Sequence, residues 1–493
     1  MVVDIRAITP EKNFPTTAFG ERLTASLTPE VALVFPYDTI NPLLTVTTTL
    51  GSGAATTENS MLKLSTGAAT SSSADLKSRS LLKYNPGQGV DARFTAMFTT
   101  GVAGSTQLIG VGDAGEGHFF GYNGAEFGVM RRYGGEYGID VLTVTTASST
   151  AENITITLDG DADATVAVTA SGNTTTTANE IASHDFTGLG NGWTATAVGS
   201  TVVFQSLDAA VHSGSFTLSG ATTAVGTFAT EVAGTAPTED WTNASDWNVD
   251  NADGNGHLPV MDWTKGNVFR IEFQYLGFGA IKYEIEDPRS GQFVPVHVEQ
   301  YANNNTRPSL DNPTMPMKAC VSNTTNNTDI VMYSGSMMGA IQGKDSFLGA
   351  QHGTDAEKGS VGTSEVPVLT IRNRLFFDGH PNRTKIKLKL VEVGNDHTKS
   401  IKYRFYNNAT LTDASFTDVT NSPATIDTSA SAFSGGVDFY NLLVGADGTE
   451  NFDFGDSEEL GVVIPGDQLT VTAETTSGTG AVAIVAMYWI DLI

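Results

Sequence analysis

One short stretch combines residue types and spacing that suit calcium binding. From Asn251 to Asp262, oxygen-bearing side chains stand at positions 1, 3 and 5, with glycine at position 6 and a carboxylate at position 12, as in an EF-hand loop. However, Asn replaces Asp at position 1, Asp replaces Glu at position 12, and no helical pattern flanks the loop. The alternative is an ordinary turn, because Asn, Asp and Gly favour turns. The candidate ligands are Asn251, Asp253, Asn255 and Asp262.

Two further acidic stretches, 159–163 and 447–459, are interpreted most simply as solvated loops, with a bound cation as the alternative. Their like charges stand close together in the sequence, and a cation would relieve the repulsion. We therefore keep Ca²⁺ as the one candidate cofactor and expect no other.

No pattern typical of a catalytic centre is present. The glycines from Gly110 to Gly115 match a dinucleotide fingerprint, but the residues that follow are strand-like, and the fingerprint needs a helix there, so we predict a turn. The eight histidines never stand four apart, and Cys320 is predicted to be an inert buried thiol. We expect no enzyme. A polysaccharide-cleaving enzyme, which would need two suitably spaced carboxylates, is the remote alternative.

Aromatic residues in the expected loops offer a different chemistry. Flat rings with polar edges can stack on sugars, so these residues are candidates for glycan binding. The competing interpretation is that they fill a hydrophobic core. The glycan candidates are Trp241, Trp247, Tyr133 and Tyr137.

Composition narrows the classes of partner. The 493 residues include 27 Lys and Arg against 54 Asp and Glu, a net charge of −27 that opposes binding to nucleic acids or anionic membranes. A single cysteine excludes an internal disulfide. The first residues lack the apolar core of a secretory signal, and the apolar stretch 481–493 is too short to span a bilayer, so we expect it to form a final buried strand.

The elements that would position these residues are mostly strands. Asn123-Gly124 between two aromatic-rich runs predicts a hairpin, and 267–275 and 384–393 alternate apolar and polar side chains. One short helix is predicted at 177–184. The fold class is therefore mainly β: a lectin-like or jelly-roll β-sandwich, interrupted by a small α+β insert and followed by a C-terminal β-sandwich.

The predicted organisation has five parts. Aromatic-rich strands before and after a Thr-rich block indicate one sandwich with an insertion. The parts are an N-terminal arm (1–36), a β-sandwich (37–142 plus 237–343), an inserted α+β module (143–236), a linker (344–363) and a C-terminal jelly-roll-like β-sandwich (364–493).

Two segments, 85–131 and 266–317, resemble an uncharacterised family of virion structural proteins of tailed phages and large, often marine, DNA viruses. The residues that carry this resemblance are Tyr84–Gly89, Ile109–Asp113, Phe119–Tyr122 and Leu276–Glu284. The C-terminal part is similar to β-sandwich modules of phage and viral surface proteins through Ile371–Arg374, Asn382–Thr384, Tyr406–Thr412 and Ile464–Asp467. The insert resembles Thr-rich modules of phage tail and fibre proteins.

The resemblance implies a non-enzymatic virion structural protein and supplies no catalytic residue. We expect a surface component of a tail or fibre, assembled in the host cytoplasm, that contacts other virion proteins. A homo-oligomer, preferably a trimer, and a host-surface glycan are the expected partners. A capsid decoration or minor capsid protein and a free glycan-binding lectin are the alternatives.

Overall fold

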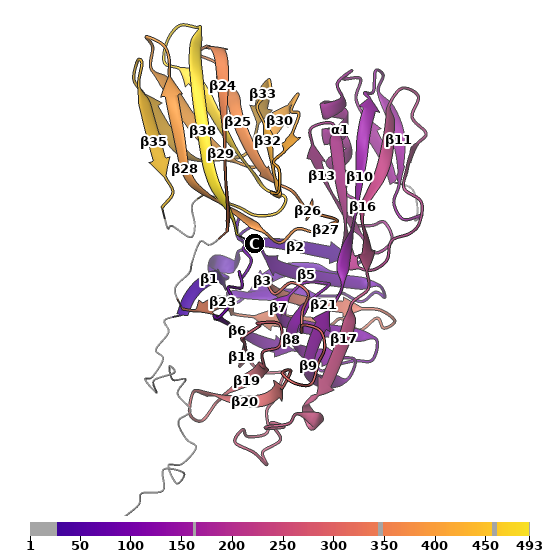
Figure 1. The fold of residues 1–493 in the computed structure, drawn as a ribbon. Helices are drawn as coiled ribbons and strands as arrows, with labels where there is room; N and C mark the ends of the chain where they lie inside the picture. Colours follow the sequence, from indigo (N-terminus) through magenta and orange to yellow (C-terminus); the bar gives the residue numbers. More distant parts are fainter. Residues whose placement is uncertain (1–26, 161–163, 344–348, 456–460, 493) are drawn as a thin grey trace, which may run out of the picture.

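The structure is a computed structural model that describes residues 27–160, 164–343, 349–455 and 461–492. A central β-sandwich lies at the bottom of Figure 1, and two further β modules rise from it. Residues 136–235 form the module on the right, here called the insert, and residues 350–492 form the module on the left, here called the C-terminal module. The fold is mainly β, as predicted, and its one α-helix among the described residues lies in the insert.

The central sandwich consists of two antiparallel sheets. The first is ordered β20-β19-β18-β6-β22-β4-β3, with β23 pairing β6 and β1: β20 (Gln292–Glu299), β19 (Ile281–Asp287), β18 (Asn267–Phe273), β6 (Gly89–Phe98), β22 (Val331–Ser334), β4 (Met61–Ser65), β3 (Ala54–Glu58), β23 (Ser336–Gln342) and β1 (Leu27–Val34). The second is ordered β17-β9-β8-β7-β21-β5-β2: β17 (Thr238–Asn243), β9 (Glu126–Tyr133), β8 (Gly117–Asn123), β7 (Ser105–Gly112), β21 (Met317–Asn323), β5 (Ser72–Ser78) and β2 (Thr45–Leu50). Alternate side chains of both sheets fill one core between them.

Aromatic rings dominate that core. Phe269 of β18 lies 5.8 Å from Phe94 and 4.9 Å from Phe120, measured between ring centroids, so it joins the two sheets. All three are buried because they occupy the inward positions of strands with period-two alternation. The predicted apolar face of 267–275 is therefore confirmed as a core face.

The insert consists of two small sheets and one helix, which share a hydrophobic core of their own. Its strands are β10 (Glu136–Thr146), β16 (Val225–Thr235), β14 (Thr201–Ala209) and β13 (Trp193–Val198) in one sheet, and β12 (Ala164–Val168), β11 (Glu152–Thr157) and β15 (Thr217–Ser219) in the other. The helix α1 (Thr174–Ala182) begins three residues earlier than the predicted 177, because the Asn173 side chain caps it by accepting the N–H of Thr176.

The C-terminal module is a second β-sandwich around its own core. One sheet contains β24 (Ala350–Val361), β38 (Ala481–Leu492), β28 (Lys385–Asn395), β35 (Thr449–Asp453) and β36 (Val462–Val463). The other contains β31 (Thr417–Asp418), β32 (Ala424–Asp427), β25 (Val366–Asn373), β37 (Gln468–Thr475), β29 (Ile401–Asn407) and β34 (Val437–Val444). Two short ribbons, β26 (Phe376–Phe377) with β27 (His380–Pro381) and β30 (Thr410–Thr412) with β33 (Ala432–Ser434), complete it.

Several local predictions are confirmed. The predicted hairpin joins β8 to β9, but its two turn residues are Gly124 and Ala125, because Asn123 pairs with Glu126 at the end of the ladder. Gly124, the first turn residue, has φ 61°. The glycine fingerprint at 110–115 joins strand β7 to strand β8 with no helix, so it is a turn. The apolar stretch 481–493 forms β38 as far as Leu492, and Ile493 lies outside the described residues.

Two predicted boundaries were wrong. The predicted linker, 344–363, contains β24, which pairs with β38 from Ala350 to Val361. Its polar, glycine-containing sequence is that of an edge strand, most of whose side chains face solvent. Likewise, residues 27–34 of the predicted arm form β1 and pair with β23. Residues 1–26 and 344–348 lie outside the described residues.

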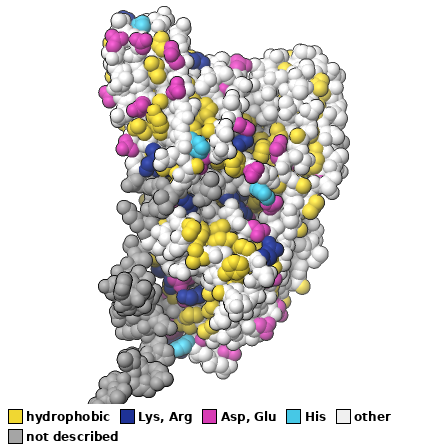
Figure 2. Space-filling view, in the orientation of Figure 1, with side chains coloured by type: hydrophobic (Ala, Val, Ile, Leu, Met, Phe, Trp, Pro, Cys, Tyr) yellow, Lys and Arg dark blue, Asp and Glu magenta, His cyan; other side chains and the backbone are white. Residues whose placement is uncertain are grey.

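Charged groups are sparse on the visible surface. Figure 2 shows that neutral polar atoms cover most of this face, while acidic side chains gather on the C-terminal module. Hydrophobic side chains on this face form small separate patches. Such a surface agrees with the low proportion of charged residues, 16%.

Candidate functional site

The outer face of the seven-stranded sheet is the floor of the main cavity. On β21, Ala319 and Val321 point into the core, so Lys318 and Ser322 point outward. On β5 the same alternation buries Leu76 and turns Asp75 and Lys77 outward. The insert and the C-terminal module rise on either side of this floor and enclose a cavity of about 770 Å³.

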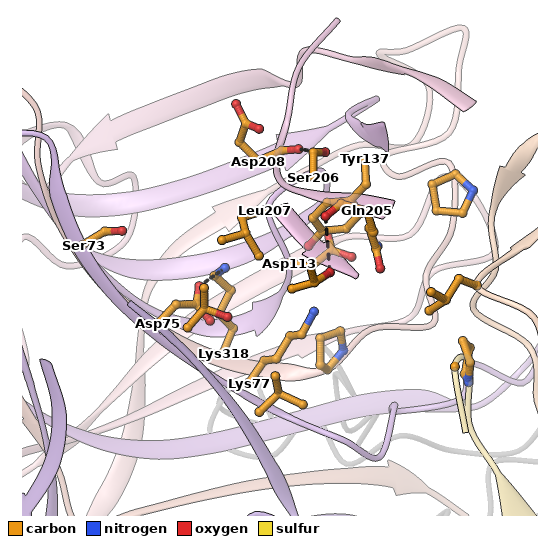
Figure 3. A pocket seen from close by; sticks show the side chains of 18 of the residues that line it. Ser73, Asp75, Lys77, Asp113, Tyr137, Gln205, Ser206, Leu207, Asp208 and Lys318 are labelled. Carbon is orange, nitrogen blue, oxygen red and sulfur yellow. Dashed lines mark hydrogen bonds and ion pairs between the residues drawn. The ribbon is translucent and has the colours of Figure 1, made fainter. Parts of the chain in front are cut away.

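All three modules contribute to this cavity, here called the cleft (Figure 3). Its volume falls in the usual range for small-molecule sites, about 300–1,000 Å³. The central sandwich supplies Asp75, Lys77 and Lys318, and β14 of the insert supplies Gln205, Ser206, Leu207 and Asp208. The C-terminal module supplies Leu375, Pro381, Asn382, Arg383, Ile464, Pro465, Gly466 and Asp467.

Most charges of the cleft are internally paired. Lys318 forms an ion pair with Asp75, and although burial opposes it, the Asp75 charge raises the pKa of Lys318 above its ordinary range. At the C-terminal wall, Arg79 approaches Asp467 at 3.6 Å. The two charges within each pair neutralise each other, and both contacts fix the shape of the cleft walls.

Arg383 forms a buried ion cluster between two modules. Its guanidinium lies 2.6 Å from Asp113 Oδ2 and 2.8 Å from Glu116 Oε2, and all three side chains are nearly buried. Burial alone would raise the pKa of Asp113, but Arg383 and two backbone N–H groups hold it below the usual value. Burial raises the pKa of Glu116, against the opposing charge of Arg383. Arg383 therefore links the C-terminal module to the β7–β8 turn.

The side chains of Lys77 and Gln205 line the cleft and are not engaged in an ion pair or a hydrogen bond with the described residues. The Lys77 ammonium lies 5.7 Å from the centroid of the Tyr137 ring and makes no ion pair with any residue that the structure describes. Among the same residues, the Gln205 side-chain amide has no hydrogen-bond partner. Figure 3 shows both extending into the space between the walls. Asp208, by contrast, accepts a hydrogen bond from the Asn191 amide at 2.8 Å.

A histidine lies beside the cleft in the insert. His212 Nδ1 lies 2.9 Å from Asp159 Oδ2, and its Nε2 lies 3.4 Å from Asp208 Oδ1. Burial opposes protonation, but hydrogen bonds to the two carboxylates raise the pKa of His212. The ring also packs against Trp193, with 4.9 Å between centroids. These contacts fix the wall on the insert side.

The predicted calcium ligands are engaged with neighbouring groups. The Asn251 amide donates to the Ala244 carbonyl at 2.9 Å, and Asp253 accepts from Asn255. Asp262 accepts from the hydroxyl and N–H of Thr264. Across the described parts of the chain, no three His, Cys, Asp or Glu side chains are grouped so as to hold a metal ion.

The sequence analysis missed the residue that organises this loop. Asp250, one position before the motif, accepts hydrogen bonds from the N–H groups of Ala252, His257 and Leu258. It is itself buried. These contacts are those of a turn stabilised by a buried carboxylate.

The four predicted glycan residues lie in different surroundings. Trp247 is buried among Phe120 and Phe127, which leaves no ring face for a sugar, so it is a core residue. Tyr133 is half-buried and contacts the guanidinium of Arg131, 4.5 Å from the ring centroid. The structure therefore does not bring the four aromatic residues together.

Trp241 and Tyr137 are the two that border the outer face of the seven-stranded sheet. Trp241 is half-buried, pairs with Met130 across β17 and β9, and lies against Gly128, where a Cβ atom would come within 2.9 Å of its ring. Tyr137 lines the cleft, and its hydroxyl accepts the N–H of Ala114 at 3.1 Å. Only Tyr137 belongs to the cleft.

Sequence reasoning missed the polar residues of the cleft. The signal for Lys77 was present, because Ser73, Asp75 and Lys77 alternate with Ala74 and Leu76. That alternation predicts an outward face of β5. It does not indicate that Gln205 and Asp208, more than 120 residues later, face it across a cavity.

No protein-family model and no curated protein match this chain. The Emp46p carbohydrate recognition domain is similar over 65% of this chain and 100% of its own, with 7% identity and a TM-score of 0.23. Lectin I-B4 of Griffonia simplicifolia has 11% identity over 63% of this chain and 99% of its own, with a TM-score of 0.23. A triple jelly-roll protein of an archaeal virus turret has 6% identity over 91% and 90%, with a TM-score of 0.18. At these values, neither site residues nor functions transfer to this chain.

The part of the chain that the structure describes contains no helix long and apolar enough to cross a membrane. Its single α-helix has nine residues, four of which are Thr.

Proposed function

We propose that this chain is a non-enzymatic structural protein of a virus particle, exposed on its surface as part of a tail or fibre. The observation that carries the proposal is the joint at Arg383, where side chains from two modules form one buried ion cluster. Buried clusters of this kind hold modules in one fixed arrangement, as a particle component needs. The resemblance of the segments around 85–131 and 266–317 to virion proteins supports the same role.

The carboxylates of the cleft support a non-enzymatic role. Asp75 is paired with Lys318, Asp113 with Arg383, and Asp467 with Arg79. A glycosidase needs one carboxyl group that donates a proton and a second that acts as base or nucleophile. Carboxylates already neutralised by cations are poorly suited to either task. A capsid decoration or minor capsid protein is the nearest alternative role.

The C-terminal module offers a surface for self-association. Strand β34 is the last strand of its sheet, so one side of its backbone has no strand partner among the described residues. Its side chains include the exposed Val437 and Leu443. Apolar edge strands pair readily with a second copy, which supports a homo-oligomer as the working form.

Light scattering of the purified full chain tests the fibre role. We expect a mass three times that of the 51.9 kDa chain, unchanged on dilution and unchanged by Ca²⁺. The variant Leu443→Lys, at the β34 edge, would lower that mass if β34 forms the contact. A monomer at every concentration would contradict a fibre role and favour a capsid-assembled decoration or a free lectin.

A further inference from the structure

One cation that lines the cleft, Lys77, is not held in a close ion pair. Asp75, Asp113 and Asp467 each have a cationic partner within 4 Å, and Asp208 is held by Asn191 and His212. Lys77 forms no ion pair within 4 Å among the described residues, although its charge helps to lower the pKa of Asp113. In a chain of net charge −27, an ammonium group left in this state inside a concave site favours a ligand with one negative charge.

The other unused groups of the cleft are neutral donors and acceptors. The Gln205 amide and the hydroxyls of Thr196, Thr48 and Ser73 line the cavity and form no hydrogen bond with the residues that the structure describes. Thr48 and Ser73 belong to the floor of the cavity, and Thr196 and Gln205 belong to the insert wall. A ligand rich in hydroxyl groups would satisfy them.

Apolar surface lies between these polar groups. The Tyr137 ring forms part of the wall next to Lys77, and the Leu207 side chain points into the same space (Figure 3). Alternating C–H faces and hydroxyl edges are the surface of a sugar ring, and such faces pack on aromatic and aliphatic side chains. One cation, hydroxyl groups and apolar surface together match the groups of an acidic sugar.

We propose that the cleft binds a carbohydrate that carries a single carboxylate, a sialic acid or uronic acid sugar. Lys77 receives the carboxylate, Gln205 and Thr196 bind ring hydroxyls from the insert side, and the partly exposed Leu207 packs against a sugar face. This inference rests on the proposed exposure of the chain on the particle surface and adds a ligand class to it. Polyphosphates are disfavoured, because Asp75 and Asp208 lie in the same cleft and only one cation is available.

Calorimetric titration of the full chain tests this proposal with matched probes. The acidic probes are 3′-sialyllactose and a glucuronic acid disaccharide, and the neutral probe is lactose. We expect at least one acidic probe to bind more than tenfold tighter than lactose, with an affinity that falls at high salt. The acidic probe that binds more tightly then identifies the sugar class, sialic acid or uronic acid.

Variants of Lys77 test the assigned role. Lys77→Met removes the charge at nearly constant volume, and we expect affinity for the acidic probe to fall by about 10- to 100-fold, the usual weight of a charged hydrogen bond. Lys77→Arg retains the charge and should restore most of the affinity. Lys265→Met, at an exposed lysine outside the cleft, is the matched control and should leave binding unchanged.

Three results would overturn the proposal: no binding of either acidic probe, equal binding of lactose, or full affinity in Lys77→Met. Equal binding of lactose would still support glycan binding. The mass in solution is measured separately, so a trimer that binds no sugar would contradict this inference and leave the structural role standing. A thermal unfolding scan of each variant confirms that it is folded.

Discussion

The two upper modules are attached to the central sandwich in different ways. The insert continues from the central sheet through two strands: β9 and β17 pair as far as Tyr133 and Thr238, and β10 and β16 resume the ladder at Glu136 and Thr235. The C-terminal module is joined by side chains, through Arg383 with Asp113 and Glu116. The joint of the insert therefore depends on main-chain strand pairing, and the joint of the C-terminal module depends on ion pairs between side chains.

A second ion pair extends the C-terminal joint. Lys385 at the start of β28 lies 2.8 Å from Glu30 of β1, and both side chains are nearly buried. The same Glu30 carboxylate accepts the backbone N–H of Lys83 at 2.8 Å. A joint built from buried charges is specific in geometry but sensitive to loss of one partner. A continuous strand ladder tolerates side-chain changes and is sensitive to the shape of its turn.

Loss of Arg383 is expected to have the largest effect on stability. Arg383→Met leaves Asp113 and Glu116 buried without their cation, which should lower the free energy of unfolding by about 3–5 kcal/mol. Urea unfolding of the full chain measures this change. Arg307→Met removes an exposed pair with Asp311 and should cost at most about 1 kcal/mol. Equal effects of the two variants would show that the joint does not depend on buried charge.

The strand joint should respond to a bulkier turn. A Cβ atom on Gly135 would lie 2.7 Å from the Gly115 Cα and 2.8 Å from Pro237 Cβ, so Gly135→Ala should cost about 1–3 kcal/mol through overpacking. Its neighbour Gly134 has φ 73° and no contact closer than 3.5 Å, so Gly134→Ala should cost only about 1 kcal/mol. Differential scanning calorimetry compares the two. The reverse order of effects would contradict tight packing at this turn.

Two carboxylates, Asp113 of the C-terminal joint and Asp140 of the insert, should respond to acid with opposite sign, and this is the smallest effect that we expect. The raised pKa of Glu116 acts against the response of Asp113. The pKa of Asp113 is lowered, so its contribution is present above pH about 4 and is lost as pH falls below that value. Burial raises the pKa of Asp140 on β10 to about 6, so the insert loses stability as pH rises from about 4 to about 6.

The variant Asp140→Asn isolates the insert's part of this response. Thermal unfolding at pH 4.5 and pH 7.5 should show a smaller difference in Tm for the variant than for the natural chain, because an amide does not titrate. Asp140 is fully buried and accepts a hydrogen bond from the Thr230 hydroxyl, which the Asn side-chain oxygen can retain. An unchanged pH dependence would rule out Asp140 as its source.

Much of the local structure could be predicted from sequence, because it depends on neighbours along the chain. The hairpin at Asn123-Gly124 follows from turn chemistry, and the core face of β18 follows from alternation. Two edge strands were missed for different reasons. In β24 most side chains face solvent, and in β1 the sequence Val31–Val34 is apolar throughout, which hides the alternation of buried Val31 and Leu33 with exposed neighbours. Their pairing partners lie more than 100 residues away.

The candidate site was less predictable for a related reason. Tyr137 was named from its residue type, and the structure places it in the cleft, while Trp247 was named for the same reason and lies in the core. Ring type alone does not separate these positions. The role of Lys77 depends on which charges find partners, and the partners of Asp75, Asp113 and Asp467 come from distant segments.

Gradient fractionation of lysates from cells that naturally make this chain tests the structural role most directly. An antibody against the purified chain follows it through the gradient, and nucleic acid marks the particle fractions. The account predicts that the chain sediments with the particles and remains with them after a wash in high salt. Recovery of the chain only in the slow-sedimenting protein fractions would contradict a structural role in a virus particle.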